Sequence, residues 1–273
     1  MCFFTALSVN AAAVAKRYGK QLDIIEAARQ ILAEQEQAER AKQESDSKHK
    51  VSFYDIHLAE DLYVIPAYAE PHCVIVSGSD KLQVMQWGLI PRTAKPEDVE
   101  RYDRQNLFKN ARAETLFEKW PWRMLWAHNR CIIPVTGFFE PHRLPDGKAQ
   151  YYFTKLKDTE IFSIAGLWDE WTNPQTKEKV LSFVLITTEA NAMMRKIHNG
   201  GNNPFRMPKI LTVEQEKRWL DLSITSAEDV RDLLSVYPEE EMQAWAVRQK
   251  FNFGDPLDPS IINPVPQQQN LEL

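Results

Sequence analysis

Four strand-like runs in the second half of the chain constrain the fold more than any other feature. Each is rich in β-branched and aromatic residues and ends near polar or turn-forming residues, a pattern typical of β-strands. The connections between them are short, which favours pairing between neighbours in the sequence. The runs are CIIPVTGFFE (131–140), AQYYFTKL (149–156), IFSIAGLWDEW (161–171) and KVLSFVLITT (179–188). They predict a sheet-rich core.

Helices and short strands are predicted around this core. Apolar spacing predicts helical structure over 11–48, and Thr212 followed by Gln215 is a capping-box signature for a later helix. Further helices are expected over 191–198 and 226–236, and short strands over 3–7, 51–84 and 242–251. No repeat or linker divides the chain, so we expect one α+β domain over 1–253 and a Pro/Gln-rich tail over 254–273.

Composition excludes several classes of protein. The chain of 273 residues has 44% hydrophobic and 26% charged residues, as ordinary globular proteins do. Its net charge of −5 argues against a wholly basic surface but leaves a local basic groove open. Cys2, Cys73 and Cys131 show no metal-ligand or disulfide spacing. The sequence shows no signal peptide and no membrane-spanning run, so we expect a cytoplasmic protein. We also expect a monomer without metal or cofactor.

The segment 101–130 is locally basic and contains three tryptophans, Trp120, Trp122 and Trp126. Cations interleaved with aromatic rings suit a groove for single-stranded nucleic acid, because cations meet phosphates and rings stack on bases. The alternative is that the tryptophans belong to the core and the arginines are solvated. Composition alone favours this alternative.

Several polar residues interrupt apolar stretches. Glu140 ends a strand-like run, where burial would raise its pKa towards a range useful for acid–base catalysis. His198 precedes a Gly/Asn-rich loop, and histidine exchanges protons near neutral pH. Asn110, Arg112 and Glu114 would project to one face of an extended segment, where they could hold a sugar and a phosphate. Each also has a purely structural interpretation as a salt-bridged, solvated or capping residue.

Cys2 offers chemistry that no internal residue can. If Met1 is removed, one residue carries both a free α-amine, with a pKa of about 7.7–8.0, and a thiol, with a pKa of about 8.5. The amine can attack a carbonyl to give a Schiff base, which the thiol then closes into a five-membered ring. By itself, Met-Cys is more often an accident of the translation start.

Taken together and in order, the motifs resemble the SOS response-associated peptidase (SRAP) family. They are Met-Cys at the start, QWGLIP (86–91), NARAET (110–115), CIIPVTGFFE, LITTEAN (185–191), and IH followed by RMP (206–208). Among the proteins of this family are abasic-site-processing proteins. With this resemblance, the predicted fold is a single α+β domain with a curved, mostly antiparallel or mixed, barrel-like β core flanked by helices.

The resemblance implies a sensor and shield of abasic sites in single-stranded DNA, with nucleoid association when bound. Cys2 would trap the sugar aldehyde as a thiazolidine crosslink after Met1 removal, and self-processing peptidase activity is also implied. Asn110 would hold Cys2 or the adduct, Glu140 would act as acid and base, and His198 would assist proton transfer. The resemblance also implies a set of DNA contacts. These are Arg112, Trp87, Thr187 and Arg206.

The sequence departs from the family pattern at several places, and two other functions stay open. Phe3 and Phe4 replace the usual Gly-Arg, Pro141 and His142 replace a usual Trp, and the loop 199–205 and the helical segment look like expansions. The alternatives are a thiol peptidase or amidase with other substrates, and a non-catalytic single-stranded DNA binder. Such a binder would need none of the four proposed catalytic residues.

Overall fold

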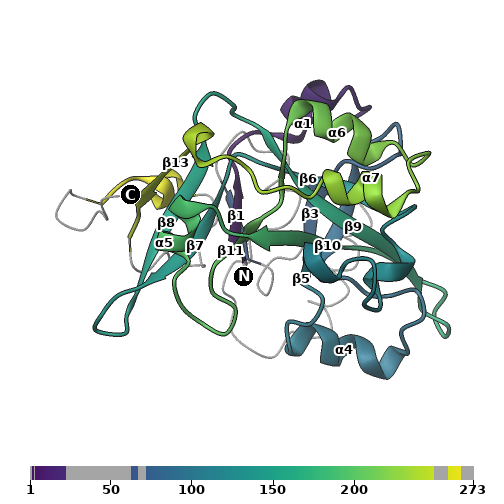
Figure 1. The fold of residues 1–273 in the computed structure, drawn as a ribbon. Helices are drawn as coiled ribbons and strands as arrows, with labels where there is room; N and C mark the ends of the chain where they lie inside the picture. Colours follow the sequence, from purple (N-terminus) through teal and green to yellow (C-terminus); the bar gives the residue numbers. More distant parts are fainter. Residues whose placement is uncertain (1, 3, 23–62, 67–71, 249–257, 266–273) are drawn as a thin grey trace.

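The computed structural model describes residues 2, 4–22, 63–66, 72–248 and 258–265. They form one mixed α+β domain in which two sheets curve around a largely shared apolar core, in a nearly closed, barrel-like arrangement (Figure 1). One sheet has the strand order β13-β8-β7-β1-β2. The other has the path β12-β9-β10-β4-β3, with β11 and β5 added to β10 and β6 added to β9. The predicted fold class is confirmed.

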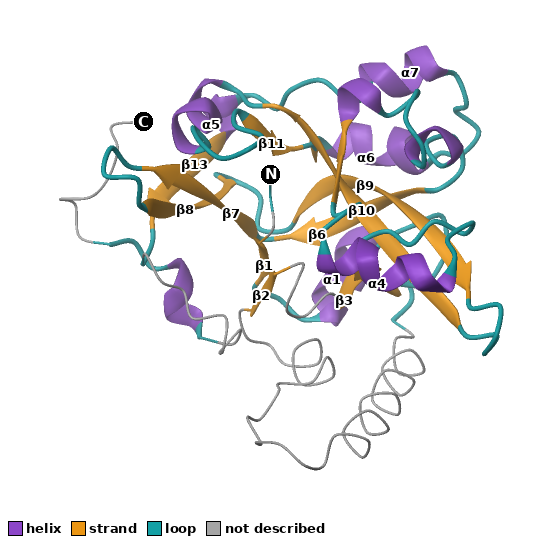
Figure 2. Ribbon diagram, turned by 90° about the horizontal axis from the view of Figure 1, so that it is seen from below, coloured by secondary structure: helices purple, strands orange, loops and turns teal. Residues whose placement is uncertain are grey.

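The strands begin and end as follows: β1 (Phe4–Leu7), β2 (Tyr63–Pro66), β3 (His72–Ile75), β4 (Gln83–Trp87), β5 (Asn110–Arg112), β6 (Arg130–Val135), β7 (Gly137–Arg143), β8 (Ala149–Leu156), β9 (Phe162–Thr172), β10 (Lys179–Glu189), β11 (Arg206–Pro208), β12 (Ile210–Leu211) and β13 (Met242–Ala246). The α-helices are α1 (Ala11–Tyr18), α4 (Pro96–Arg104), α5 (Ala192–Ile197), α6 (Val213–Leu220) and α7 (Ala227–Asp232). Short 3₁₀ turns are η1 (Ala113–Thr115), η2 (Trp122–Met124), η3 (Glu239–Glu241) and η4 (Pro259–Ile262). Figure 2 shows α6 and α7 grouped together, apart from α5.

Strand β1 is an interior strand of its sheet. It pairs antiparallel with β2 on one side and with β7 on the other, so that Phe4 lies opposite both Pro66 and Phe139. All four of its residues are buried. The chain near its N-terminus is therefore held by hydrogen bonds on both sides, in the middle of the molecule (Figure 1).

The run predicted over 131–140 is two strands that belong to different sheets. β6 pairs with β9, whereas β7 pairs with β1 and β8. The change of sheet occurs at Thr136, whose hydroxyl accepts from the backbone N–H of Ser8 at 3.0 Å and donates to the carbonyl of Ala6 at 3.2 Å. The prediction of one strand was wrong because the apolar pattern continues unbroken through a buried crossing between sheets.

Helix α1 is shorter than the sequence predicted. It begins after the N-cap Asn10 and ends at Gly19, which adopts a left-handed conformation with φ 61°. Gln21 then forms a bridge with Lys81, so the helical structure predicted over 11–48 is interrupted after Tyr18. Residues 23–48 lie outside the described residues. The capping box of α6 is confirmed, with the Thr212 and Gln215 side chains each accepting from the other's backbone N–H.

The three tryptophans of 101–130 have different environments. Trp122 is buried, Trp126 is half-buried against the core, and Trp120 is exposed but packs edge-on against Phe108. The core interpretation is right for Trp122.

Part of the predicted tail packs on the domain. Ile261 is buried beside Phe4 and Phe139, and the indole N–H of Trp245 donates to the carbonyl of Ile262 at 2.6 Å. Residues 254–257 and 266–273 lie outside the described residues.

Gly166 tests how tightly β9 is packed between β6 and β10. A Cβ at this position would lie 2.6 Å from Ile133 Cδ1 and 2.8 Å from the carbonyl oxygen of Val184, which cannot move away easily. We expect Gly166→Ala to lower the free energy of unfolding by about 1–3 kcal/mol, measured by urea denaturation. Gly78→Ala is the control, because its Cβ would make only an ordinary contact at 3.6 Å. Equal stability of the two variants would contradict this packing.

Candidate active site

Cys2 and Asn110 are brought together from opposite sheets. Cys2 lies two residues before the start of β1 and is 1% exposed. Asn110 begins β5, and its side-chain amide donates to the carbonyl of Cys2 at 2.9 Å. This hydrogen bond fixes the backbone of Cys2 in addition to the strand pairing of β1. The predicted association of these two residues is present in the structure.

Glu140 and His198 form the second half of the site. Glu140 lies within β7 and is fully buried, and His198 directly follows α5 and is 3% exposed. Their facing atoms, His198 Nε2 and Glu140 Oε2, are 3.9 Å apart. The two side chains are thus close enough to exchange a proton after a small approach.

Burial dominates the electrostatics of the site. It raises the pKa of the Cys2 thiol well above its ordinary value, and the adjacent Glu140 carboxylate raises it further. Burial also raises the pKa of Glu140, an effect that His198 opposes. The thiol and the carboxyl group therefore both favour their protonated forms more than they would in water. The site holds protons that a reaction can use.

Four buried side-chain atoms have no hydrogen-bond partner within the described part of the chain. They are Asn110 Oδ1, both carboxylate oxygens of Glu140, and Arg206 Nε. Most buried polar atoms in proteins are paired, because an unpaired one costs about 1–3 kcal/mol. Three of these four atoms belong to Asn110 and Glu140, two of the four predicted catalytic residues. Their free hydrogen-bonding capacity is suited to a bound substrate.

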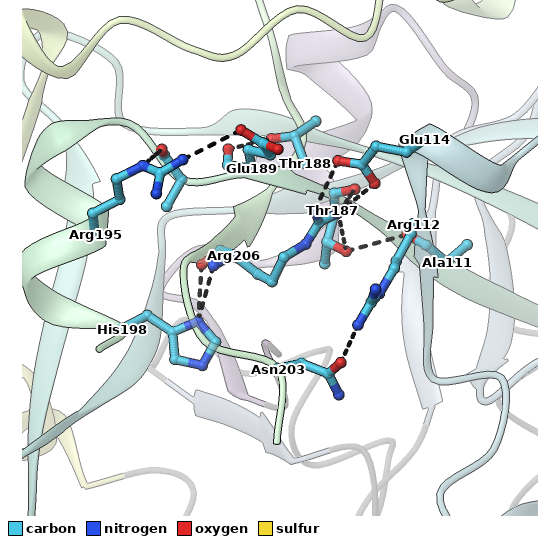
Figure 3. A network of polar contacts seen from close by, with 11 residues as sticks. Ala111, Arg112, Glu114, Thr187, Thr188, Glu189, Arg195, His198, Asn203 and Arg206 are labelled. Atoms are coloured by element: carbon cyan, nitrogen blue, oxygen red, sulfur yellow. Dashed lines mark hydrogen bonds and ion pairs between the residues drawn. The ribbon is translucent and has the colours of Figure 1, made fainter. Parts of the chain in front are cut away.

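Arg112 lies at the edge of the site. It is exposed, and its guanidinium donates to the side-chain carbonyl of Asn203 in the loop 199–205 (Figure 3). Asn199, in the same loop, is fixed to the end of β7 by hydrogen bonds with both backbone groups of Arg143, at 2.7 and 3.1 Å. The loop therefore makes hydrogen bonds with the ends of both β7 and β5. The sequence indicated an unusual loop, but it could not indicate these contacts, because Asn203 and Arg112 are far apart in the chain.

Trp87, Thr187 and Arg206 are buried and contact other parts of the protein. The indole of Trp87 is 1% exposed, stacks on Phe183 and donates to the carbonyl of Lys109 at 2.9 Å. Thr187 is 1% exposed, and Arg206 is 8% exposed and paired with Glu114. Contacts of these three side chains with DNA stay a prediction.

Glu114 is placed differently from the prediction. Asn110 and Arg112 flank the buried Ala111 in an extended segment, as expected, but β5 ends at Arg112 and Glu114 lies in the 3₁₀ turn η1. Its partner is Arg206, with Nη1 2.7 Å from Oε1. Nothing in the sequence pattern links these two residues, which lie on separate elements.

A second buried histidine was not predicted. His142 lies two residues beyond Glu140 on β7 and is 8% exposed. Its Nδ1 is 2.9 Å from the carbonyl of Lys196 in the last turn of α5, next to His198. The alternation of β7 could have indicated that His142 shares a face with Glu140.

The described residues contain neither a membrane-spanning helix nor a metal-binding cluster. No helix among them is both long enough and apolar enough to cross a membrane. No group of three or more His, Cys, Asp or Glu side chains within the same residues could hold a metal ion.

A family model described as "SOS response associated peptidase (SRAP)" matches residues 1–253. The chain belongs to the SRAP family. Among its SRAP relatives, the abasic site processing protein YoqW of Bacillus subtilis is 36% identical over 190 residues, which are 69% of this chain and 80% of the relative. The abasic site processing protein HMCES of Xenopus tropicalis is 28% identical over 171 residues, 56% of this chain and 49% of that protein.

Solved structures show the same fold. A crystal structure of a Bacteroides thetaiotaomicron protein superposes with a TM-score of 0.79 at 33% identity, covering 97% of this chain and all (100%) of that chain. A Bordetella bronchiseptica protein superposes with a TM-score of 0.66 at 22% identity, covering 90% and 100% of the two chains, and is similar in fold alone.

Glu140→Gln tests the electrostatics of the candidate site. Folded Glu140 has a pKa above the unfolded value of about 4.3, so the folded state binds more protons in the window above pH 4.3. The wild-type protein therefore loses stability as the pH rises through that window. The glutamine side chain of the variant does not titrate, so the variant has no such loss. We expect the free energy of unfolding of Glu140→Gln, minus that of wild type, to increase from about pH 4 upward in urea denaturation.

The matched control is Glu170→Gln, which removes an exposed carboxylate that pairs with Lys179 on a neighbouring strand. For this variant we expect a much smaller change with pH, because exposed pairs contribute little. A Glu140→Gln difference that stays flat or decreases with rising pH would contradict a desolvated Glu140.

Proposed function

We propose that the protein processes abasic sites in DNA by capturing the sugar aldehyde covalently through Cys2, after Met1 has been removed. The unpaired polar atoms of Asn110 and Glu140 around a buried Cys2 carry the proposal. Family membership supports it, because several relatives are named abasic site processing proteins. A sugar aldehyde brings a hydroxyl and a carbonyl that could use these hydrogen-bonding atoms.

The chemistry follows from the terminal aminothiol. The ring-closed abasic sugar opens when its C1′–O4′ bond breaks, the C1′ hydroxyl loses its proton, and O4′ gains one, leaving an aldehyde. The Cys2 amine adds to C1′, and loss of water gives an iminium ion. The thiol then loses its proton and forms the C1′–S bond, closing a thiazolidine. The product is protein plus DNA minus one water, with no oxidant or reductant.

Each buried side chain has a role in moving these protons. Protonated Glu140 gives its proton to O4′ during opening and to the hydroxyl that leaves as water. The resulting carboxylate takes the proton of the Cys2 thiol, which lies beside it. His198, 3.9 Å from Glu140, exchanges protons with the carboxyl group between these steps. Asn110 keeps Cys2 in place through the Cys2 carbonyl.

DNA binding is proposed for Arg112. Its exposed guanidinium, at the edge of the site, would contact a backbone phosphate in place of Asn203. Single-stranded DNA is the proposed form, because the abasic sugar must reach a site that is buried within the protein. We propose that a monomer is sufficient, since both halves of the site come from one chain.

A thiol peptidase acting on other substrates is less well supported. Such an enzyme needs a thiolate nucleophile, which is favoured by a lowered pKa. Burial and Glu140 instead raise the pKa of Cys2. An iminium ion formed on the same residue is a strong electrophile next to the thiol, so the thiazolidine route does not require a standing thiolate.

The proposal predicts a Cys2-dependent, heat-stable crosslink. Wild-type protein should shift a labelled single-stranded oligonucleotide with one abasic site on a denaturing gel after heating. Cys2→Ser keeps the amine but lacks the thiol, so we expect loss of the heat-stable product and recovery of a crosslink when borohydride reduces the Schiff base. Cys73→Ser is the control, because it removes a buried thiol from another strand and should crosslink as wild type does.

A wild-type protein with a processed N-terminus that forms no crosslink would refute the proposal. Equal heat-stable crosslinking by Cys2→Ser would also refute it. Tight, salt-sensitive binding to intact and abasic strands alike, without any crosslink, would instead support a non-catalytic single-strand binder.

A further inference from the structure

The ion pair between Glu114 and Arg206 has an unusual position. Arg206 Nη1 and Nη2 contact the two carboxylate oxygens of Glu114 at 2.7 and 2.9 Å, and Nη2 also donates to the carbonyl of Thr187 at 2.8 Å (Figure 3). Arg206 is 8% exposed. A two-fold contact of this type fixes both distance and orientation, so the pair holds the backbone of Arg206 more firmly than a single contact would.

The pair spans β10. Thr187 of β10 is the register partner of Arg112 on β5 and of Pro208 on β11, so β5 and β11 lie on opposite sides of it. Glu114 follows β5, and Arg206 begins β11. Their ion pair therefore connects two segments of the proposed active site. One is β5, which begins with Asn110, and the other is β11, which follows the loop after His198.

The backbone of Arg206 contacts the ring of His198. His198 Nδ1 is 3.0 Å from the carbonyl oxygen of Arg206 and 3.4 Å from its amide nitrogen, and the amide N–H of Phe205 donates to the carbonyl of His198 at 2.8 Å. In the shorter contact Nδ1 must donate, because a carbonyl can only accept, whereas in the longer contact Nδ1 accepts from the amide N–H of Arg206, so the two contacts belong to opposite tautomers. The shorter contact favours the tautomer with the proton on Nδ1. In the neutral ring with its proton on Nδ1, Nε2 carries the lone pair. Nε2 is also the atom that faces Glu140.

We propose that Glu114 is a positioning residue that, through Arg206, fixes the Nδ1–H tautomer and the orientation of His198. This inference rests on the proposed function, because it concerns the same Cys2 site. With the proton held on Nδ1, Nε2 accepts a proton from Glu140 and returns it. Without the ion pair, the Arg206 carbonyl shifts, the Nε2–H tautomer becomes populated, and that form cannot accept the proton.

Charge and burial support this role. The ion pair with Arg206 lowers the pKa of Glu114, although partial burial opposes it. Glu114 is therefore ionised at neutral pH, when the pair is needed. Arg206 is the more buried partner, with a side chain 10% exposed against 44% for Glu114. Removing the carboxylate would leave a buried guanidinium without its counter-charge, which favours movement of β11.

The test compares Glu114→Gln with Glu189→Gln in the full chain. Glu189 is the register partner of Arg206 and forms an exposed ion pair with Arg195 at 3.3 Å, so this control removes a carboxylate from the same strand pair. The first readout is the ¹⁵N spectrum of the protein labelled at its six histidines, with His198→Asn used for assignment. The second is the crosslinking rate with saturating abasic oligonucleotide over a range of pH.

We expect wild type and Glu189→Gln to show His198 as the Nδ1–H tautomer and to crosslink at equal rates. Glu114→Gln should show both tautomers and a crosslinking rate lower by about 10–100-fold, the range found for residues that orient metal-ligating histidines through a hydrogen bond to the other ring nitrogen. Its affinity for an intact strand should be unchanged, because Glu114 does not contact DNA in this account.

Three results would overturn the inference. They are an Nε2–H tautomer in wild type, an unchanged tautomer in Glu114→Gln, and an unchanged rate in Glu114→Gln. The wild-type spectrum decides the first even if the variant does not fold. The spectra need no DNA, so a failure of wild type to crosslink would refute the proposed function while the tautomer of His198 is still measured.

Discussion

The insertion of β1 between β2 and β7 is the constraint on which the site depends. A chain terminus is usually free to fray, and a terminal nucleophile on a frayed end could not be oriented. Here the strand that follows Cys2 is paired on both sides, and Asn110 holds the Cys2 carbonyl from the other sheet. The same pairing with β7 places Cys2 beside Glu140. Orientation of the proposed nucleophile is thus a property of the sheet.

The polar residues at the centre of the molecule are costly to bury, and the proposed function accounts for their presence. A fully buried carboxyl group with unpaired oxygens, a buried thiol and a buried histidine would each be replaced by apolar side chains in a core selected for stability alone. Their burial raises the pKa values of Glu140 and Cys2 and so keeps protons available. Most other buried polar side chains have partners, as Arg130 does with the carbonyls that end α6.

The sequence predicted most elements but not their long-range contacts. The periodicity of β8, β9 and β10 and the capping box of α6 are local signals, so they were readable. The break at Thr136 was hidden because both strands are buried and apolar. The family resemblance named Asn110, Glu140 and His198 but assigned Arg206 to DNA. Arg206 pairs with Glu114 because β5 and β11 both pair with β10. No local sequence pattern indicates this arrangement.

The most direct test of the account is the intact mass of the purified protein before and after incubation with abasic single-stranded DNA. The account predicts a starting mass lower than the full sequence by one methionine residue. It then predicts a product equal to protein plus oligonucleotide minus one water, with the modification mapped to Cys2. A product of that mass formed while Met1 is retained, or attached at any residue other than Cys2, would contradict the account, because a thiazolidine requires the free amine and the thiol of one terminal cysteine.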